Sequence, residues 1–371
     1  MDTAAELIPV TLLTGFLGSG KTTVLNRLVQ QPELADALII INEFGDMALD
    51  HMLVAHSTEN LVMEMSSGCL CCTIRGDLVQ TLRDIVWRFS RNGQRQFRRV
   101  VIETTGLADP LPIIHTLMTH PQIVDRYRLD GIVTTLDFAT GGHTLDHHPE
   151  AVRQAAIADC LLLTKADLVP SDAREALQRR LDGINPAAPR WEVSHGEVGA
   201  ARVLNLGLFS TDGKSPDVER WLQAEAYADE AEHGHAHAAH EGHDHAAAHD
   251  HGEGPHHDVN RHDDHIQAFC FSVDEPIPKD VAAAWLEALM GLVGSKILRF
   301  KGILNIEGND TPVVLHGVQH ILHPLATLPG WPGDDRRSRL VFITQDVGRE
   351  VIEDTFRVFS HVLPLAWEAE R

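Results

Sequence analysis

Short apolar runs alternate with amphipathic stretches between residues 8 and 210 of the chain. Such runs, bounded by polar residues and glycines, are typical of buried strands. We expect five strands, at residues 8–14, 37–42, 99–104, 131–137 and 160–165. Four further segments space their apolar residues as helices do, at 23–31, 77–89, 112–120 and 172–184. This alternation predicts an α/β fold in which helices cover a mostly parallel sheet.

The pattern changes twice further along the chain. Residues 226–265 are acidic and rich in histidine, with few apolar positions, so we expect a linker that adds nothing to a core. Strand patterns return at 266–273, 296–308, 311–322 and 339–345, and helical patterns lie at 280–293 and 349–359. The sequence therefore predicts an α/β domain at 1–225, a linker at 226–265 and a smaller α+β domain at 266–371.

Composition and charge exclude several classes of protein. The formal net charge of −22 argues against a broad nucleic-acid-binding surface. No apolar run reaches the roughly 18 residues that span a bilayer, and the first ten residues lack the basic start of a signal peptide. Five cysteines, an odd number, do not suggest a secreted disulfide framework. We expect a cytoplasmic protein with neither a nucleic-acid nor a membrane partner.

The stretch "GFLGSGKT" at residues 15–22 fits the P-loop pattern and lies between a predicted strand and a predicted helix. Glycines in such a loop turn backbone N–H groups toward phosphate oxygens, and the helix N-terminus adds its positive dipole end. Lys21 can reach the β- and γ-phosphates, and the Thr22 hydroxyl can bind Mg²⁺. The nucleotide is expected to contact Gly15, Gly18, Ser19, Gly20, Lys21, Thr22 and Thr23.

A second part of the nucleotide site is predicted at "VVIETTG", residues 100–106. A buried strand there delivers Glu103, which can hold Mg²⁺ or its water, and Gly106 lets the backbone approach the γ-phosphate. The alternative is a surface glutamate that merely ends a strand. Lys21 and Glu103 are the candidate catalytic residues, although for Glu103 the role of general base and that of magnesium ligand both stay open.

The base is predicted from "TKAD", residues 164–167, at the end of another predicted strand. The carboxylate of Asp167 only accepts hydrogen bonds, and guanine presents two adjacent donors that it can pair with. Adenine would leave the charge unpaired, which is costly when buried. The stem of Lys165 can pack over the base. We therefore expect a guanine nucleotide, GTP or GDP, at Thr164, Lys165 and Asp167.

Three cysteines, Cys69, Cys71 and Cys72, lie within four positions. A bridge between the last two would be strained, and a strand that alternates faces cannot bury all three. Thiolates suit Zn²⁺ or Cu(I), and three sulfurs leave one ligand position of a closed zinc site open. We predict a metal site, with buried core cysteines as the alternative. Cys160 and Cys270 stand alone in apolar strands and are expected to be core residues.

Twelve of the 24 histidines lie between His233 and His265. One interpretation is a solvated acidic linker in which the histidines only add polarity. The other is weak capture of metal at many sites, because neutral imidazoles bind Zn, Ni, Co and Cu and the interleaved acids attract cations. The residues expected to take part are His233, His235, His237, His243 and His245.

Together these motifs resemble the CobW family of P-loop GTPases, which includes YjiA-like proteins and zinc-regulated GTPase metalloprotein activators. The resemblance covers nearly the whole chain, and its most specific motif is "GCLCC" after a P-loop and "NEFG". It implies a GTPase domain followed by a CobW C-terminal domain. It also implies that "NEFGDMALD" is switch I, with Asn42, Glu43 and Asp50 sensing the γ-phosphate and Mg²⁺, and that "ETTGLADP" is switch II.

The family resemblance further implies a metallochaperone that couples GTP hydrolysis to metal delivery. We expect the intrinsic rate to be slow without a partner, because no arginine finger is evident in the sequence. The resemblance places Cys69, Cys71 and Cys72 between the two switches as the Zn²⁺ site, with GTP and Mg²⁺ as cofactors and a client metalloprotein as partner. Thr164 stands where many GTPases have Asn, but the Lys and Asp are kept, so guanine preference should survive. The alternatives are a cobalt (Co²⁺) chaperone for cobalamin synthesis, a zinc-buffering binding protein and a P-loop kinase. The sequence leaves the oligomeric state open, a homodimer included.

Overall fold

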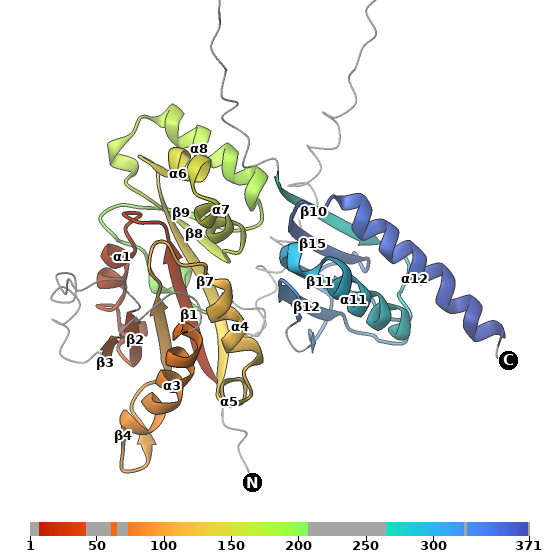
Figure 1. Ribbon diagram of the computed structural model, residues 1–371, viewed down its shortest axis with the longest axis horizontal. Coiled ribbons are helices and arrows are strands. Elements are labelled where there is room, and N and C mark those ends of the chain that lie inside the picture. The colour runs from red at the N-terminus through yellow and green to blue at the C-terminus, as the bar shows by residue number, and fades with distance from the viewer. Residues whose placement is uncertain (1–6, 42–60, 65–72, 207–264, 323–324, 370–371) are drawn as a thin grey trace, which may run out of the picture.

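The computed structural model describes residues 7–41, 61–64, 73–206, 265–322 and 325–369 (Figure 1). Within these ranges the chain forms two units, each built on its own sheet. The first unit contains the nucleotide motifs, and the second begins with a strand at Ile266. The predicted linker at 226–265 lies outside the described residues except for His265.

The first unit contains a seven-stranded sheet in the described residues, with strand order β3-β2-β6-β1-β7-β8-β9 and every pairing parallel. Its strands are β1 (Ile8–Gly15), β2 (Ala37–Ile41), β3 (Leu61–Glu64), β6 (Arg99–Glu103), β7 (Tyr127–Asp137), β8 (Cys160–Thr164) and β9 (Arg190–Val193). A small hairpin pairs β4 (Ser90–Arg91) with β5 (Gln94–Arg95). The expected mostly parallel α/β fold is confirmed.

All five predicted strands of this sheet are present. The sequence reasoning missed both edge strands, β3 and β9, and the first four residues of β7. Edge strands are short here, and "LVME" and "RWEV" carry charged residues, so neither makes a long apolar run. The start of β7, "YRLD", contains Arg128 and Asp130, which pair with each other at the sheet's amino edge.

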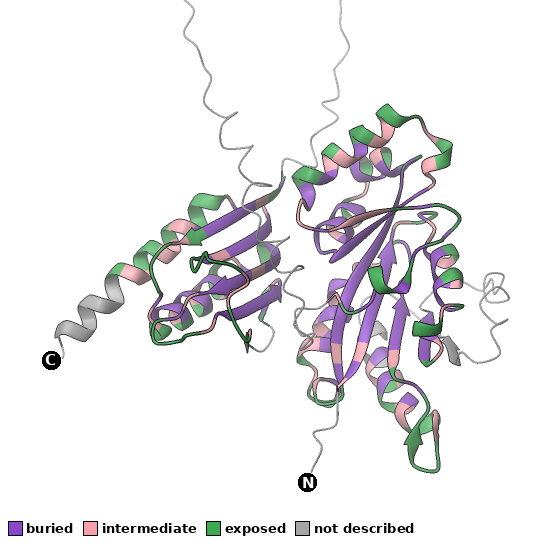
Figure 2. Cartoon of the chain, turned by 180° about the vertical axis from the view of Figure 1, so that it is seen from behind, coloured by how far each residue is buried: buried purple, intermediate pink, exposed green. Residues whose placement is uncertain are grey.

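Helices cover both faces of this sheet, as strands buried on two faces require. They are α1 (Lys21–Leu28), α3 (Thr73–Arg88), α4 (Leu111–Thr119), α5 (Pro121–Val124), α6 (Gly141–His147), α7 (Pro149–Ala156) and α8 (Ser171–Ile184). Alternate residues of β1 show the arrangement. Leu12 packs in the core beneath α3 to α8, whereas Leu13 packs in the core beneath α1. The burial pattern is visible in Figure 2.

The second unit is an antiparallel sheet with strand order β10-β15-β11-β12-β13 and β14 paired with β12. Its strands are β10 (Ile266–Val273), β11 (Ile297–Leu304), β12 (Val313–Val318), β13 (Ile321–Leu322), β14 (Ala326–Thr327) and β15 (Ser338–Gln345). The helices are α11 (Lys279–Val293) and α12 (Arg349–Ala369). The predicted strands and helices are present, which confirms the expected smaller α+β unit.

The two faces of the antiparallel sheet have different neighbours. One face packs on α11 and α12, where Phe271, Trp285 and Phe356 form an aromatic cluster with ring centroids 5.1–5.6 Å apart. The other face turns toward the first unit, and its Leu298 and Ile343 join that unit's core (Figure 1). The second unit is therefore packed against the first through buried apolar contacts as well as polar ones.

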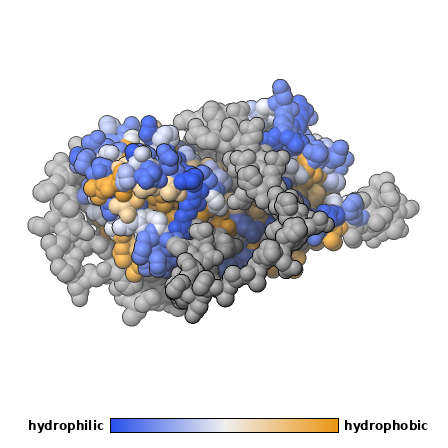
Figure 3. Space-filling view, turned by 90° about the horizontal axis from the view of Figure 1, so that it is seen from above, coloured by the Kyte–Doolittle hydropathy of each residue, from blue (hydrophilic) through white to orange (hydrophobic). Residues whose placement is uncertain are grey.

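The described helices can be compared with the length and hydropathy that a membrane-spanning segment requires. Among the described residues, no helix combines the length and the apolar character needed to cross a bilayer. The coloured part of the face in Figure 3 is mixed, with hydrophobic patches among hydrophilic residues.

Candidate nucleotide site

The P-loop follows β1 directly and turns back over the end of the sheet into α1. Its glycines adopt the backbone conformations that make this turn possible, with φ of +139° at Gly15, +71° at Gly18 and +95° at Gly20. A Cβ at Gly15 would lie 2.3 Å from the Thr135 hydroxyl oxygen, so only glycine fits there. The loop therefore packs tightly against β7 and leads directly into the N-terminus of α1, whose first backbone N–H groups can bind phosphate.

Two polar side chains stabilise the loop from inside. The Lys21 ammonium donates to the carbonyl oxygens of Gly15 at 2.9 Å and Phe16 at 3.1 Å. The buried Ser19 hydroxyl donates to the Phe16 carbonyl at 2.7 Å. Lys21 is thus held across the loop that the sequence predicts to bind phosphate. Thr23 is exposed in the first turn of α1.

Thr22 and Glu103 come together from two different elements. The Thr22 hydroxyl, in the first turn of α1, donates to Glu103 Oε1 at 2.9 Å. Glu103 ends β6, which pairs with β1 and places Glu103 beside Leu13 in the register. The carboxylate is buried, at 5% exposure. Hard oxygen donors this close together at a helix N-terminus are the donor set that Mg²⁺ takes beside nucleotide phosphates.

The "TKAD" residues occupy the end of β8 and the turn after it. The Thr164 hydroxyl donates to the Ser19 carbonyl at 2.8 Å, which joins this strand to the P-loop. Lys165 has a left-handed backbone with φ of +58°, and its ammonium lies 3.8 Å from Asp137 Oδ2. Asp167 is exposed in the 3-10 helix Ala166–Leu168. Its carboxylate is therefore accessible beside the loop that Thr164 anchors.

Asp137 was missed in the sequence reasoning. It ends β7 and accepts hydrogen bonds from the Thr140 N–H at 2.7 Å and the Thr140 hydroxyl at 2.8 Å, besides its contact with Lys165. The signal was available, because a carboxylate at the carboxyl end of a buried parallel strand lies at the edge where ligands bind.

The segment after β6, residues 104–110, lies directly against the P-loop. The Thr104 hydroxyl donates to the Thr14 hydroxyl at 2.8 Å. A Cβ at Gly106 would lie 2.5 Å from the Leu17 backbone nitrogen, so this glycine allows two backbones to meet. The residues predicted as switch II thus contact the loop predicted to bind phosphate.

The two isolated cysteines are core residues, as expected. Cys160 is fully buried in β8 and Cys270 is buried in β10. Burial raises the pKa of the Cys160 thiol to about 12, so it stays protonated at neutral pH and is a poor metal ligand. Burial also raises the pKa of Cys270.

The predicted zinc ligands, the predicted switch I residues and the linker histidines fall outside the described part of the chain. This applies to Cys69, Cys71 and Cys72, to the switch I residues Asn42, Glu43 and Asp50, and to His233, His235, His237, His243 and His245. Among the residues that are described, no group of three or more His, Cys, Asp or Glu side chains is placed to hold a metal ion.

Comparison with known proteins identifies the family. Residues 9–192 match the CobW/HypB/UreG nucleotide-binding domain, and residues 266–360 match the cobalamin synthesis protein cobW C-terminal domain. The chain is 31% identical over 350 residues to a protein of Escherichia coli named zinc chaperone YjiA, covering 94% of this chain and 98% of that protein.

Two further relatives extend the comparison. A Schizosaccharomyces pombe protein named zinc-regulated GTPase metalloprotein activator 1 is 32% identical over 221 residues, covering 58% of this chain and 53% of that protein. The solved structure described as Zn(II)-bound YjiA GTPase from E. coli superposes with a TM-score of 0.66 at 26% identity, covering 95% of this chain and 99% of that one. With its P-loop, its parallel sheet and both domains matched, the chain belongs to the CobW family of P-loop GTPases.

Proposed function

We propose that this GTPase is a zinc metallochaperone, in which the GTP cycle controls a metal site at Cys69, Cys71 and Cys72. GTP and GDP bind at the P-loop and "TKAD" residues named above, Lys21 and Glu103 act on the phosphates, and the metal passes to a client metalloprotein. Zinc is the cargo, and the cytoplasm is the proposed location. The names of the E. coli and S. pombe relatives support the choice of zinc and of a client.

The observation that carries the proposal is the register of four adjacent strands. Leu13 of β1 pairs with Glu103 of β6, Glu103 pairs with Ile41 of β2, and Ile41 pairs with Glu64 of β3. At about 4.8 Å per strand, the end of β3 lies roughly 10 Å from the backbone of Glu103. The chain therefore leaves β3 at the nucleotide edge of the sheet, five residues before Cys69.

The other end of the same connection supports the idea as well. Helix α3 begins at Thr73, directly after Cys72. Both elements that flank the cysteine motif therefore belong to the first unit. We infer that a rearrangement at the γ-phosphate affects the cysteine motif through these two flanking elements.

Magnesium fits the pair formed by Thr22 and Glu103. Both offer oxygen atoms, they meet at 2.9 Å, and the carboxylate supplies the negative charge. When bound there, Mg²⁺ would neutralise phosphate charge during transfer to water. The chain's own residues do the remaining work: the loop amides and Lys21 orient the phosphates, and Thr164 holds the loop in place.

Coupling between metal and nucleotide requires that zinc bind with different affinity in the two nucleotide states, and by reciprocity nucleotide affinity must depend on zinc. We would measure zinc affinity by competition with a chromophoric chelator, with GDP and then with a non-hydrolysable GTP analogue. A form lacking residues 233–265 prevents the histidines from masking the cysteines. The expected result is a nucleotide-dependent affinity that Cys72→Ser abolishes.

The other outcomes separate the rival functions. Equal zinc affinities in both nucleotide states would contradict the coupling and favour a zinc buffer. Tighter binding of Co²⁺ than of Zn²⁺ at the cysteines, in the same assay, would favour cobalt delivery. Serine in place of Cys160, a buried cysteine outside the motif, tests whether loss of any thiol has the same effect.

A further inference from the structure

Helix α7, residues Pro149–Ala156, contacts both the nucleotide loops and the second unit. At its amino end, the ring of His148 stacks on Phe16 of the P-loop, with centroids 4.3 Å apart and an interplanar angle of 29°. Just after its carboxyl end, the carbonyl of Ile157 accepts a hydrogen bond from Arg299 of β11. One short helix thus lies between the P-loop and the C-terminal sheet.

The central contact of this helix is made by Gln154, which is 1% exposed. Its side-chain Nε2 donates to the carbonyl oxygens of Gly106 at 3.2 Å and Ala108 at 2.9 Å. Its own backbone carbonyl accepts from the Thr134 hydroxyl of β7 at 2.8 Å. Gln154 is therefore anchored to the sheet while its amide holds the segment that follows Glu103.

A neighbouring residue strengthens this attachment. Arg153 lies 3.8 Å from the Asp109 carboxylate, and Asp109 also accepts from the backbone N–H of Leu111, the first residue of α4, at 3.0 Å. Helix α7 therefore contacts residues 106–109 at three places. Because Gly106 lies against the backbone of Leu17, any shift of this segment also moves its contact with the P-loop.

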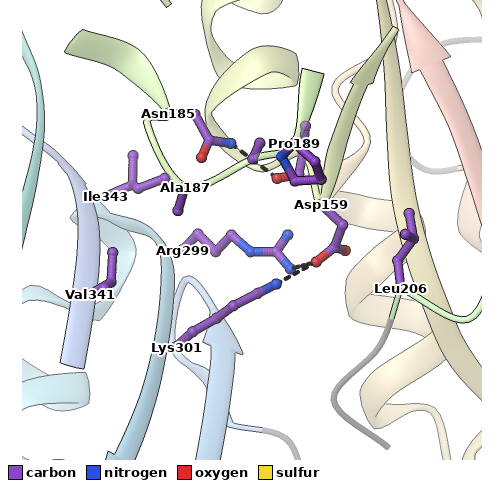
Figure 4. Close-up of a pocket in the computed structure, with 11 residues that line it drawn as sticks. Asp159, Asn185, Ala187, Pro189, Leu206, Arg299, Lys301, Val341 and Ile343 are labelled. Atoms are coloured by element: carbon purple, nitrogen blue, oxygen red, sulfur yellow. Dashed lines mark hydrogen bonds and ion pairs between the residues drawn. The ribbon is translucent and has the colours of Figure 1, made fainter. Parts of the chain in front are cut away.

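Side chains from other elements also form hydrogen bonds at the carboxyl end of α7. The side-chain amide of Asn185 donates to the carbonyls of Ala155 and Ala158, each at 3.0 Å, which ties the end of α7 to the residue that follows α8. Asp159, two residues beyond Ile157, accepts from Arg299 and from the Lys301 ammonium at 2.6 Å (Figure 4). The end of α7 is thus fixed in part by residues of β11.

We propose that Gln154 is a positioning residue for GTP hydrolysis, and that its position depends on the docking of the C-terminal sheet against α7. Gln154 acts by holding the carbonyls of Gly106 and Ala108, and thereby the backbone that runs from Glu103 past the P-loop. This inference rests on the GTPase activity of the family and not on zinc delivery, so each can fail without the other.

The first test replaces Gln154 by Leu in the full-length chain, which keeps the size of the side chain and removes both donated hydrogen bonds. We expect kcat for GTP hydrolysis to fall about tenfold while KM for GTP stays within about twofold. Val152→Ala is the matched control, because Val152 is buried on the same helix but belongs to the apolar core. It should lower stability and leave kcat near the wild-type value.

A structural role alone would give a different pattern. If Gln154→Leu left kcat unchanged, or changed kcat and KM only as Val152→Ala does, the positioning role would be overturned. Should Gln154→Leu fail to fold, Arg153→Met keeps the question answerable, since Arg153 is partly exposed. Its loss breaks the contact with Asp109 and an ion pair with Glu150 within α7. We expect this variant to lower kcat about threefold, and an unchanged kcat would count against the proposal.

The second test asks whether the contact between the C-terminal sheet and α7 affects GTP hydrolysis through Gln154. Arg299→Met removes the donor to Ile157 and Asp159, and we expect it to lower kcat about threefold in the wild-type background. In the Gln154→Leu background it should have almost no further effect, because the segment at 106–108 is already released. Effects that multiply would show two independent actions and overturn the interdomain part of the proposal.

Discussion

The hydroxyl of Thr22 donates a 2.9 Å hydrogen bond to the carboxylate of Glu103, although 81 positions separate the two residues in the chain. The first turn of α1 and the end of β6 are brought together because β1 and β6 are adjacent parallel strands. Polar groups delivered by adjacent strands meet at the carboxyl edge, which is where ligands bind in open α/β sheets. This pair is the centre of the proposed phosphate and magnesium site.

Glu103→Gln keeps the size of the side chain and removes its charge. We expect GTP hydrolysis to fall about 100-fold, because a neutral amide would hold Mg²⁺ beside the phosphates less well and cannot accept a proton from the attacking water. Nucleotide binding measured without magnesium should change little. Steady-state phosphate release is the measurement, with Glu33→Gln, an exposed glutamate of the same unit, as the control. Full activity of Glu103→Gln would remove this residue from the proposed site.

Thr164→Val preserves the shape of the side chain and deletes the hydrogen bond to the Ser19 carbonyl. Loss of one such bond costs about 1 kcal/mol, or roughly fivefold in affinity. We expect the affinity for GTP and for GDP to weaken by that factor, since the P-loop would be held less firmly in both states. Fluorescent-nucleotide titration measures the change. Thr164→Asn, which restores a donor, should recover most of the affinity; if Thr164→Val binds as tightly as the wild type, the anchoring role is wrong.

Asp167→Asn tests the choice of base. The aspartate accepts two hydrogen bonds, whereas asparagine offers one acceptor and a donor. We expect GTP affinity to drop about 100-fold and the affinity for XTP to rise, because xanthine carries a carbonyl where guanine carries the 2-amino group. Competition between the two nucleotides measures the switch. Unchanged preference for GTP would show that Asp167, exposed in the described structure, does not contact the base.

The buried carboxylate of Asp159 makes the interface between the two units sensitive to acid. Burial by itself would raise the pKa of Asp159, but the nearby Arg299 and Lys301 outweigh burial and hold the pKa well below its usual value of 3.8. A lowered pKa in the folded state stabilises the protein above the unfolded pKa and loses that contribution as the pH falls through the folded value. Stability should therefore hold at neutral pH and decline below about pH 4.

Asp159→Asn should remove this dependence and leave Arg299 buried without its charged partner. We expect the free energy of unfolding at pH 7 to fall by about 3 kcal/mol. Urea unfolding at several pH values is the measurement. Asp36→Asn is the matched control, because its ion pair with Arg98 is mostly exposed and should matter little. Equal effects of the two substitutions would contradict the importance of burial.

Much of this protein could be predicted from local patterns alone. Five strands of the parallel sheet and the strands and helices of the second unit appear where the apolar patterns place them. The reason is that the spacing of apolar residues, which indicates both the kind of element and its buried face, can be read from residues close together in the sequence. The P-loop was equally predictable, because glycine spacing before a helix has few other uses. The burial of Cys160 and Cys270 followed from the apolar strands around them.

Other features depended on which distant segments meet. Strand order made Glu103 the neighbour of Leu13 and brought Asp137 to Lys165, and no local pattern contains that order. Gln154 looks in the sequence like an ordinary polar position on a helix, yet it is buried and holds the backbone of Gly106. A buried amide must find partners wherever the fold brings carbonyls within reach, so its role is decided by tertiary packing alone. The same holds for Arg299, whose partners Ile157 and Asp159 lie in the other unit.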